Sequence, residues 1–291
     1  MKRRQFAQVS SLALGAGLFS GRAMADEAGA KPLLTLGLLT DVHYADKETQ
    51  GSRFYRDSLA KGREAAAFFQ EKKPAAVICL GDVIDAAKTV EEETTYLKAI
   101  AKVLDEAGVP RHHVLGNHCV ATLTKAEFFE HSGQAVKKGY YSVDLNGVHV
   151  VILDACFNKK MEAYERDNFQ WNDANIPPLE QVWLAQDLAD TELPVVVFAH
   201  QRLDLEPKNN HAVKQSPEVR RILETSAKVK AVFQGHSHKN ELHEVAGIPY
   251  CTLKAMVEGG GEKNSSYSLL EVFADGSLKL KGFRTQVDRE L

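Results

Sequence analysis

Five short motifs place histidine, aspartate or asparagine directly after apolar runs of the sequence. In chain order they are Asp41-Val42-His43, Gly81-Asp82, Gly116-Asn117-His118, His200 and Gly235-His236-Ser237-His238. Imidazole, carboxylate and an asparagine carbonyl together suit divalent manganese, iron or zinc better than calcium. Each motif alone is weak evidence, because Gly-Asp is often a turn, and His236 with His238 could be a mononuclear zinc pair or two histidines on one strand face. Together, the motifs indicate a single metal site.

The apolar runs before these motifs have the length and composition of buried β-strands. Such strands are expected at residues 33–40, 75–80, 113–115, 195–199 and 229–234. Amphipathic stretches predict helices at residues 54–70, 91–107, 179–190 and 217–226. Because sites in α/β folds collect at the carboxyl ends of strands, the five motifs are expected to converge on one pocket.

Two pairs of turn residues predict hairpins that add antiparallel strands to this core. Asn146-Gly147 separates the apolar runs 140–145 and 148–153, and Asp275-Gly276 marks a second turn near the C-terminus. The fold class is therefore α/β with a bias towards parallel strands. No linker rich in proline, serine or glycine divides residues 26–291, so we expect one catalytic domain there.

Residues 1–25 have the features of a secretory signal. A basic start containing Arg3 and Arg4 precedes a mild apolar stretch at residues 6–20, and Ala23-Met24-Ala25 offers small residues at a cleavage site. The paired arginines resemble the twin-arginine signal, which predicts passage through the twin-arginine translocase to the periplasm or the medium. A transmembrane anchor is the alternative, but the apolar stretch is shorter than the roughly 20 residues that span a bilayer.

Charge and cysteine content exclude several classes of protein. The chain carries 36 basic and 39 acidic side chains, and loss of the signal with its four basic residues leaves a net charge near −7. Such a chain is not expected to bind nucleic acid or an anionic membrane surface. Its four cysteines are far apart, which argues against a disulfide-stapled scaffold.

The order of the five motifs resembles that of the calcineurin-like metallophosphoesterases over nearly the whole predicted mature chain. The resemblance implies a four-layer α-β-β-α sandwich of two mixed sheets, and two divalent metal ions, manganese or iron, with zinc also compatible. Asp82 would bridge the two ions. The implied ligands are Asp41, His43, Asp82 and His238 for one ion, and Asp82, Asn117, His200 and His236 for the other.

The resemblance also implies a mechanism. Two cations about 3.5–4 Å apart bind phosphoryl oxygens and lower the pKa of a water between them, and the resulting hydroxide attacks phosphorus in line. His118 would assist the leaving oxygen instead of binding metal. Asp85 matches the carboxylate that fixes the other imidazole nitrogen, and a role as a turn or helix-cap residue is its alternative.

One position departs from the family pattern, which usually has an acidic residue after Gly-Asn-His. This chain has Cys119 there. We expect Cys119 to alter the rate or the metal preference without abolishing activity. A disulfide between Cys119 and Cys156 is possible, although the sequence does not favour it.

Residues 44–46 and 51–59, together with Gly81-Asp82-Val83-Ile84-Asp85, resemble the corresponding stretches of the manganese-dependent ADP-ribose/CDP-alcohol diphosphatase group. Arg53 or Arg56 would bind the second phosphate of a diphosphate substrate, and an arginine on a solvated helix face is the alternative for either residue. Residues 254–261 could form a flexible wall of the pocket or a plain surface turn.

The stretch at residues 156–178 lacks clean periodicity and is expected to be a long loop over the site, or a packed surface loop with no ligand role. Its aromatic residues Tyr164, Phe169 and Trp171 are candidates for stacking on a nucleobase or sugar. The remaining histidines have no partner at a ligand spacing and are expected to be structural. They are His112, His113, His131, His149, His211 and His243.

These observations predict an exported metal-dependent hydrolase of phosphodiesters or nucleotide-type diphosphates. One alternative is a broad-specificity phosphomonoesterase on the same metal site. Others are a non-catalytic scaffold of the same fold and a periplasmic metal carrier. A scaffold would be expected to have lost ligands, whereas all seven predicted ligands and His118 are present.

Overall fold

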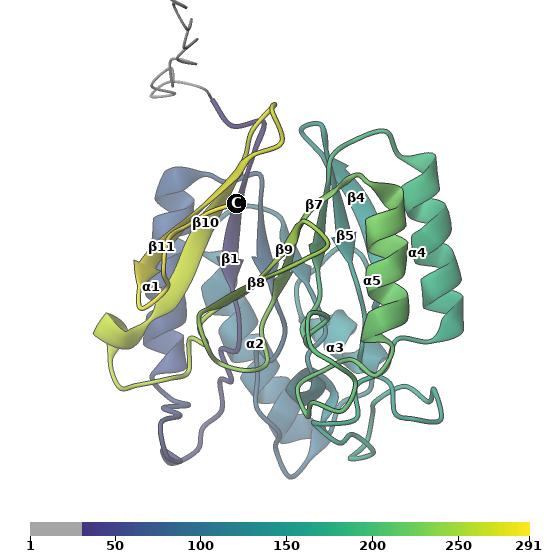
Figure 1. Ribbon diagram of the computed structural model, residues 1–291. Helices are drawn as coiled ribbons and strands as arrows, with labels where there is room; N and C mark the ends of the chain where they lie inside the picture. Colours follow the sequence, from purple (N-terminus) through teal and green to yellow (C-terminus); the bar gives the residue numbers. More distant parts are fainter. Residues whose placement is uncertain (1–30) are drawn as a thin grey trace, which may run out of the picture. The chain divides into compact units, whose positions relative to one another are not determined.

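The computed structural model describes residues 31–291, so the predicted signal lies outside the described residues. The described part contains two six-stranded sheets, with strand orders β12-β11-β10-β1-β2-β3 and β4-β5-β6-β7-β9-β8. Figure 1 shows α1 and α2 beside the first sheet and α4 and α5 beside the second. Among residues 31–291, no helix has the length and apolar character needed to cross a membrane.

The first sheet is parallel through β1, β2 and β3, and antiparallel where β10 joins β1. Its strands are β1 (Leu34–Leu39), β2 (Ala76–Cys79), β3 (Arg111–His113), β10 (Ser266–Val272), β11 (Leu278–Arg284) and β12 (Arg289–Glu290). The helices of this half are α1 (Ser58–Lys72), α2 (Val90–Asp105) and α3 (Lys125–His131), with the short 3-10 turns η1 (Asn117–Val120) and η2 (Glu262–Asn264).

The second sheet is parallel through β5, β6, β7 and β9, and is closed at its edges by the antiparallel strands β4 and β8. Its strands are β4 (Tyr141–Leu145), β5 (Val148–Ile152), β6 (Val195–Phe198), β7 (Val229–Gln234), β8 (Glu241–Val245) and β9 (Ile248–Thr252). The helices of this half are α4 (Pro178–Asp190) and α5 (Ser216–Ser226).

Alternating side chains of the central strands enter separate apolar layers, because successive residues of a strand point to opposite faces. On β1, Leu36 and Leu38 pack with Val150 and Phe198 of the facing sheet, whereas Leu39 belongs to the layer beneath α1 and α2. A third layer joins the second sheet to α4 and α5. Three apolar layers between four structural layers confirm the predicted α-β-β-α sandwich of two mixed sheets.

Two helix predictions differ from the structure. Helix α1 begins at Ser58 instead of Phe54, because Gln50 and Arg53 exchange two backbone hydrogen bonds of 3.1 Å in a turn before it. Helix α3 was not predicted, although it carries a capping box in which Thr124 and Glu127 satisfy each other's backbone N–H groups. Its seven residues are too few to display a clear helical period.

Candidate metal centre

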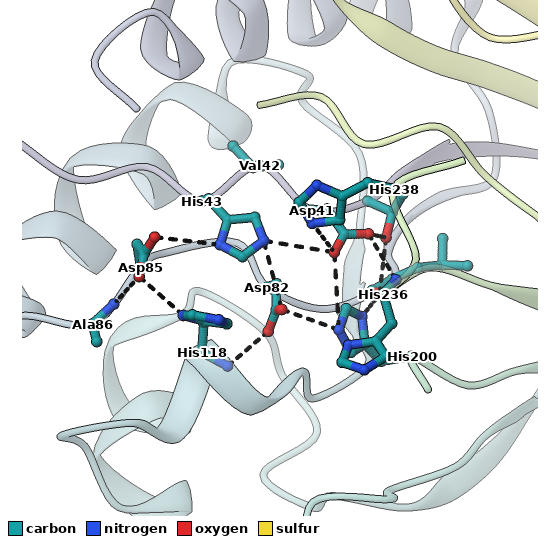
Figure 2. Close-up of polar contacts among 12 residues, drawn as sticks. Asp41, Val42, His43, Asp82, Asp85, Ala86, His118, His200, His236 and His238 are labelled. Atoms are coloured by element: carbon teal, nitrogen blue, oxygen red, sulfur yellow. Dashed lines mark hydrogen bonds and ion pairs between the residues drawn. The ribbon is translucent and has the colours of Figure 1, made fainter. Parts of the chain in front are cut away.

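Six of the seven predicted ligands lie together in Figure 2, and all seven follow the carboxyl ends of parallel strands in the two sheets. Asp41 and His43 follow β1, Asp82 follows β2, Asn117 follows β3, His200 follows β6, and His236 and His238 follow β7. The sheets therefore face each other with their ligand-bearing ends at the same edge of the sandwich.

The backbone at five of these residues adopts positive φ, which non-glycine residues rarely do. The angles are 49° at Asp41, 46° at His43, 47° at Asp82, 67° at His236 and 61° at His238. Such conformations cost about 1–3 kcal/mol each and persist where the surrounding structure fixes them, often at functional sites. Their concentration here indicates that the turns are shaped for the site.

Asp82 lies between two groups of ligand atoms. On one side, Asp41 Oδ1 is 3.2 Å from His238 Nε2 and 3.6 Å from His43 Nε2. The same His43 nitrogen is 3.6 Å from Asp82 Oδ2. On the other side, Asp82 Oδ2 is 3.1 Å from His200 Nε2, and both residues cluster with His236. A shared carboxylate between two clusters is the arrangement that a bridging ligand requires.

Several polar atoms of the site are buried with no hydrogen-bond partner among residues 31–291. They are Asp41 Oδ1, both ring nitrogens of His43, both amide atoms of Asn117, His200 Nε2 and His236 Nε2. Leaving such an atom unpaired costs about 1–3 kcal/mol, so a concentration of them indicates a missing partner. Carboxylate oxygen, imidazole nitrogen and an amide oxygen fit divalent metal ions of the manganese, iron and zinc type.

Some groups of the site already have the charge state that cation binding requires. Burial opposes ionisation of Asp41, but the imidazoles of His238 and His200 outweigh it and hold the pKa of Asp41 well below its usual value. Burial also opposes ionisation of Asp82, whose pKa is nevertheless held low by His200 and His118. Burial and the neighbouring His200 lower the pKa of His236 to about 3, so this ring is neutral, as a ligand must be. For His200 and His238, burial is outweighed by the neighbouring carboxylates, which raise the pKa of each ring to about 9, so a metal ion must displace a proton from each.

Glycines in the motifs allow the ligand loops to approach closely. A Cβ atom at Gly116 would overlap the Asp82 carboxylate, and one at Gly235 would lie 2.6 Å from Asp41 Oδ2. A Cβ atom at Gly81 would overlap the His200 ring, and the backbone there also has a positive φ of 92°. These positions require glycine because the neighbouring side chains occupy the space of a Cβ atom.

His118 and Asp85 form a hydrogen-bonded pair beside the ligands, as expected. His118 Nδ1 lies 2.9 Å from Asp85 Oδ1, and the His118 backbone N–H donates to Asp82 Oδ1 at 2.8 Å. Burial raises the pKa of Asp85, but the hydrogen bond to His118 and the His43 ring, whose Nδ1 lies 3.7 Å from Asp85 Oδ2, outweigh it and hold that pKa below its usual range. Asp85 does not cap a described helix, since the N-cap of α2 is Thr89.

The two candidate arginines lie in different surroundings. Arg56 is half exposed and already paired, with Nε 2.5 Å from Asp46 Oδ1 and Nη1 2.6 Å from Glu48 Oε1. Arg53 pairs through its backbone with Glu258, and its charge acts on His238. The structure therefore favours Arg53 over Arg56 as a residue that acts at the site.

The three aromatic residues that were candidates for stacking on substrate also differ in their surroundings. Tyr164 is fully buried, with its hydroxyl donating to the carbonyls of Gln170 and Asp173, so its expected stacking on substrate is wrong. The Phe169 ring lies 5.6 Å from that of His118. Trp171 is 45% exposed, and its ring lies 6.3 Å from that of His236. Its ring therefore remains a candidate for stacking on a nucleobase or sugar.

Three residues at the site were not identified from the sequence. Glu258 Oε1 lies 2.6 Å from His238 Nδ1, and Lys47 Nζ lies 3.5 Å from Asp85 Oδ1. His211, expected to be structural, has its ring 5.2 Å from that of His236. None of them stands at a recognisable spacing from the motifs, because the fold alone brings their segments to the site.

Cys119 is fully buried in the apolar layer beneath α1 and α2. Burial and the nearby Asp82 raise the pKa of its thiol, so it stays protonated. Cys79, Cys119, Cys156 and Cys251 are all free, in agreement with the view that no disulfide is favoured. An effect of Cys119 on rate or metal preference stays a prediction.

Replacing Cys119 with aspartate should destabilise the metal-free protein. A carboxylate there would be buried among apolar side chains and repelled by Asp82, with a cost of about 3–5 kcal/mol in the free energy of unfolding. Urea unfolding of Cys119→Asp and of the neutral, equally sized Cys119→Asn would separate charge from size. Equal stability of the two variants would contradict this account of the thiol's surroundings.

Comparison with known proteins places the chain in a wider group. The model of the calcineurin-like phosphoesterase family matches residues 34–240. The manganese-dependent ADP-ribose/CDP-alcohol diphosphatase of Xenopus laevis is 32% identical over 97 residues, which cover 30% of this chain and only 27% of that protein. The protein of the same name from Oryza sativa subsp. japonica is 26% identical over 310 residues, covering 90% of this chain and 94% of its own length.

Two further relatives extend the comparison. The serine/threonine-protein phosphatase CPPED1 of Rattus norvegicus is 28% identical over 200 residues, which cover 64% of this chain and 58% of that protein. Among solved structures, a dimetal phosphatase from Danio rerio superposes with a TM-score of 0.78 at 19% identity, over 89% of this chain and 99% of its own. This likeness supports the fold.

The family match covers most of the chain and every motif that carries the candidate ligands. The ligand types and their unpartnered buried atoms fit divalent metal ions. The chain therefore belongs to the calcineurin-like phosphoesterase family.

Proposed function

We propose that this protein hydrolyses the diphosphate bond of nucleotide-type diphosphates, or a phosphodiester of similar shape, at a two-metal site centred on Asp82. The observation that carries this proposal is the position of Asp82, whose carboxylate lies 3.6 Å from His43 on one side and clusters with His200 and His236 on the other, while the His118 backbone N–H donates to it. Asp41, His43 and His238 would complete one metal site. The other would be completed by Asn117, His200 and His236.

When bound, the two metal ions would polarise the phosphoryl oxygens and acidify an attacking water. The protein's own groups would hold the ligands in place and manage the leaving group. Because Asp85 engages Nδ1 of His118, the Nε2 atom of this imidazole is left to donate a proton to the departing oxygen. The 20% exposure of the His118 side chain is compatible with access for substrate.

The diphosphate assignment is supported by the names of the relatives and by Arg53. The relatives from frog and rice are both named as ADP-ribose/CDP-alcohol diphosphatases. Arg53 would place a positive charge near His238, where a second phosphate could bind bidentately. The exposed Trp171 lies on the His236 side, where a flat base or sugar could pack against it. A phosphomonoesterase is the second candidate, since one relative is named a protein phosphatase.

A substrate panel tests this proposal. ADP-ribose, a CDP-alcohol, a phosphodiester and a phosphomonoester would be incubated with protein loaded separately with Mn²⁺, Fe²⁺, Zn²⁺ or Mg²⁺. We expect two phosphorylated products from ADP-ribose, fastest with Mn²⁺ or Fe²⁺. Release of orthophosphate from the monoester alone would favour the phosphomonoesterase.

A pair of arginine variants sharpens the panel. Arg53→Ala should raise KM for ADP-ribose more than KM for a phosphomonoester, because only the diphosphate offers a second phosphate. Arg56→Ala is the matched control, since Asp46 and Glu48 already occupy its guanidinium. Equal effects of both variants on both substrates would contradict the role of Arg53.

We also propose that the protein is exported through the twin-arginine route to the periplasm or the medium. Arg3 and Arg4, the apolar stretch at residues 6–20 and Ala23-Met24-Ala25 support this proposal. Cell fractionation of the parent and of an Arg3→Lys/Arg4→Lys variant tests it. Retention of the parent in the cytoplasm would contradict export.

A further inference from the structure

Glu258 contacts the proposed metal ligand His238 on the side of its ring that faces away from the metal site. Its Oε1 atom lies 2.6 Å from Nδ1 of His238, whose Nε2 atom lies 3.2 Å from Asp41 Oδ1. A carboxylate that accepts the Nδ1 proton fixes the tautomer and the orientation of an imidazole, and leaves Nε2 free to bind a metal. The Glu258 side chain is 16% exposed, so water competes little for this contact.

The backbone that carries Glu258 is itself held by a buried lysine. Lys61 lies in α1 and is 0% exposed. Its Nζ atom donates to the carbonyl oxygens of Met256 at 2.7 Å, Glu258 at 3.1 Å and Gly259 at 2.6 Å. The three N–H bonds of the ammonium group thus have three acceptors, all in one short segment.

A fully buried lysine is rare, because removing its charge from water is costly. Here the partners are carbonyl oxygens instead of a carboxylate, so the contact fixes the path of the backbone. The contact ties residues 256–259 to α1, which favours a fixed wall of the pocket over a flexible one.

The same end of α1 also holds the first ligand loop. Ser58 Oγ donates to the carbonyl of Val42, between Asp41 and His43, at 2.5 Å. The Val257 N–H donates to the Asp41 carbonyl at 3.0 Å, which joins the two loops directly. One helix end thus organises both segments that support the Asp41, His43 and His238 cluster.

We propose that Lys61 and Glu258 form a positioning pair that sets the affinity of the metal site containing His238. This inference rests on the metal ligands of the proposed function. Lys61 fixes the backbone of Glu258, Glu258 fixes the ring of His238, and His238 presents Nε2 beside Asp41. Neither residue touches substrate or the reacting atoms.

The test measures Mn²⁺ binding directly, without turnover. Metal-stripped full-length protein would be dialysed against a series of free Mn²⁺ concentrations, and bound metal counted per chain. Loss of a group that orients a metal ligand typically costs about 10–100-fold in affinity. We expect Glu258→Gln and Lys61→Met each to raise one Mn²⁺ dissociation constant within that range and to leave the second ion in place.

The double variant separates positioning from general destabilisation. If Lys61 acts through Glu258, then Lys61→Met/Glu258→Gln binds Mn²⁺ no more weakly than the weaker single variant. Lys72→Met is the matched control, because Lys72 lies in the same helix but is exposed and pairs with Glu71. It should bind Mn²⁺ as the parent does.

Thermal unfolding in chelator provides the second readout. A Lys61→Met protein that melts earlier yet binds both Mn²⁺ ions with parent affinity would overturn the inference, as would effects of the single variants that multiply in the double variant. If Lys61→Met does not fold, Ser52→Ala replaces it, because Ser52 lies against the same segment: its carbonyl accepts from the Gly259 N–H at 2.8 Å, and its side chain, after His238, helps to keep the pKa of Glu258 low. Unchanged affinity in both Ser52→Ala and Glu258→Gln would likewise overturn the inference.

The parent protein distinguishes this failure from failure of the proposed function. A parent that binds no Mn²⁺ would overturn the metal-site assignment and the positioning pair together. A parent that binds two ions, with variants that bind them equally well, would overturn the positioning pair alone.

Discussion

His118→Ala should lower kcat by about 10²–10⁴-fold while leaving the metal content unchanged. His118 is oriented by Asp85 at 2.9 Å, and its proposed role is to protonate the leaving oxygen. The loss should therefore be larger for substrates whose leaving group has a high pKa than for an activated aryl phosphate. Steady-state kinetics on such a pair of substrates, with metal analysis of the same samples, checks this.

Two further variants complete the experiment. Asp85→Asn should lower kcat in the same direction, because it weakens the hydrogen bond to Nδ1 of His118. His131→Ala, at the end of α3, is the control and should retain parent activity. If His118→Ala hydrolysed both substrates at the parent rate, the leaving-group role would be wrong and the metal assignment would stand.

Asp82→Asn should have the largest effect on metal content. The Asp82 carboxylate lies 3.6 Å from His43 and clusters with His200 and His236, and an amide offers only one good metal-binding oxygen and no charge. We expect fewer than two Mn²⁺ ions per chain and loss of detectable hydrolysis. Mass spectrometric metal analysis after dialysis, together with activity at saturating Mn²⁺, measures both.

Asp187→Asn makes the same chemical change outside the proposed ligands, since Asp187 on α4 pairs with His149 on β5. It should retain metal and activity. An Asp82→Asn protein that kept two tightly bound ions would show that Asp82 does not bridge them.

The sequence predicted the ligand motifs and the strands before them because both are local patterns. Asp41, Asp82 and His200 each follow a short apolar run, and the rule that strand ends carry the site then places them together. The hairpin at Asn146-Gly147 was likewise predictable, because that turn requires residues that tolerate positive φ, as both do here.

Contacts between distant segments were not predictable in the same way. Glu258 reaches His238 only because β9 returns beside β7, and Lys61 reaches the Glu258 segment across 197 positions of sequence. Arg56 and Tyr164 were candidates for substrate binding by residue type alone. Arg56 is already paired with Asp46, and Tyr164 is buried away from any substrate. The type of a residue shows which interactions its side chain can make. Whether that side chain can reach a substrate depends on the path of the loops around it.

In the proposed site, Asp82 joins two divalent ions. A crystal structure of the protein grown with Mn²⁺, with anomalous difference maps measured near the manganese edge, tests it most directly. We expect two manganese peaks about 3.5–4 Å apart, with the Asp82 carboxylate between them and His118 binding neither ion. A single peak, or two peaks that do not share Asp82, would contradict it.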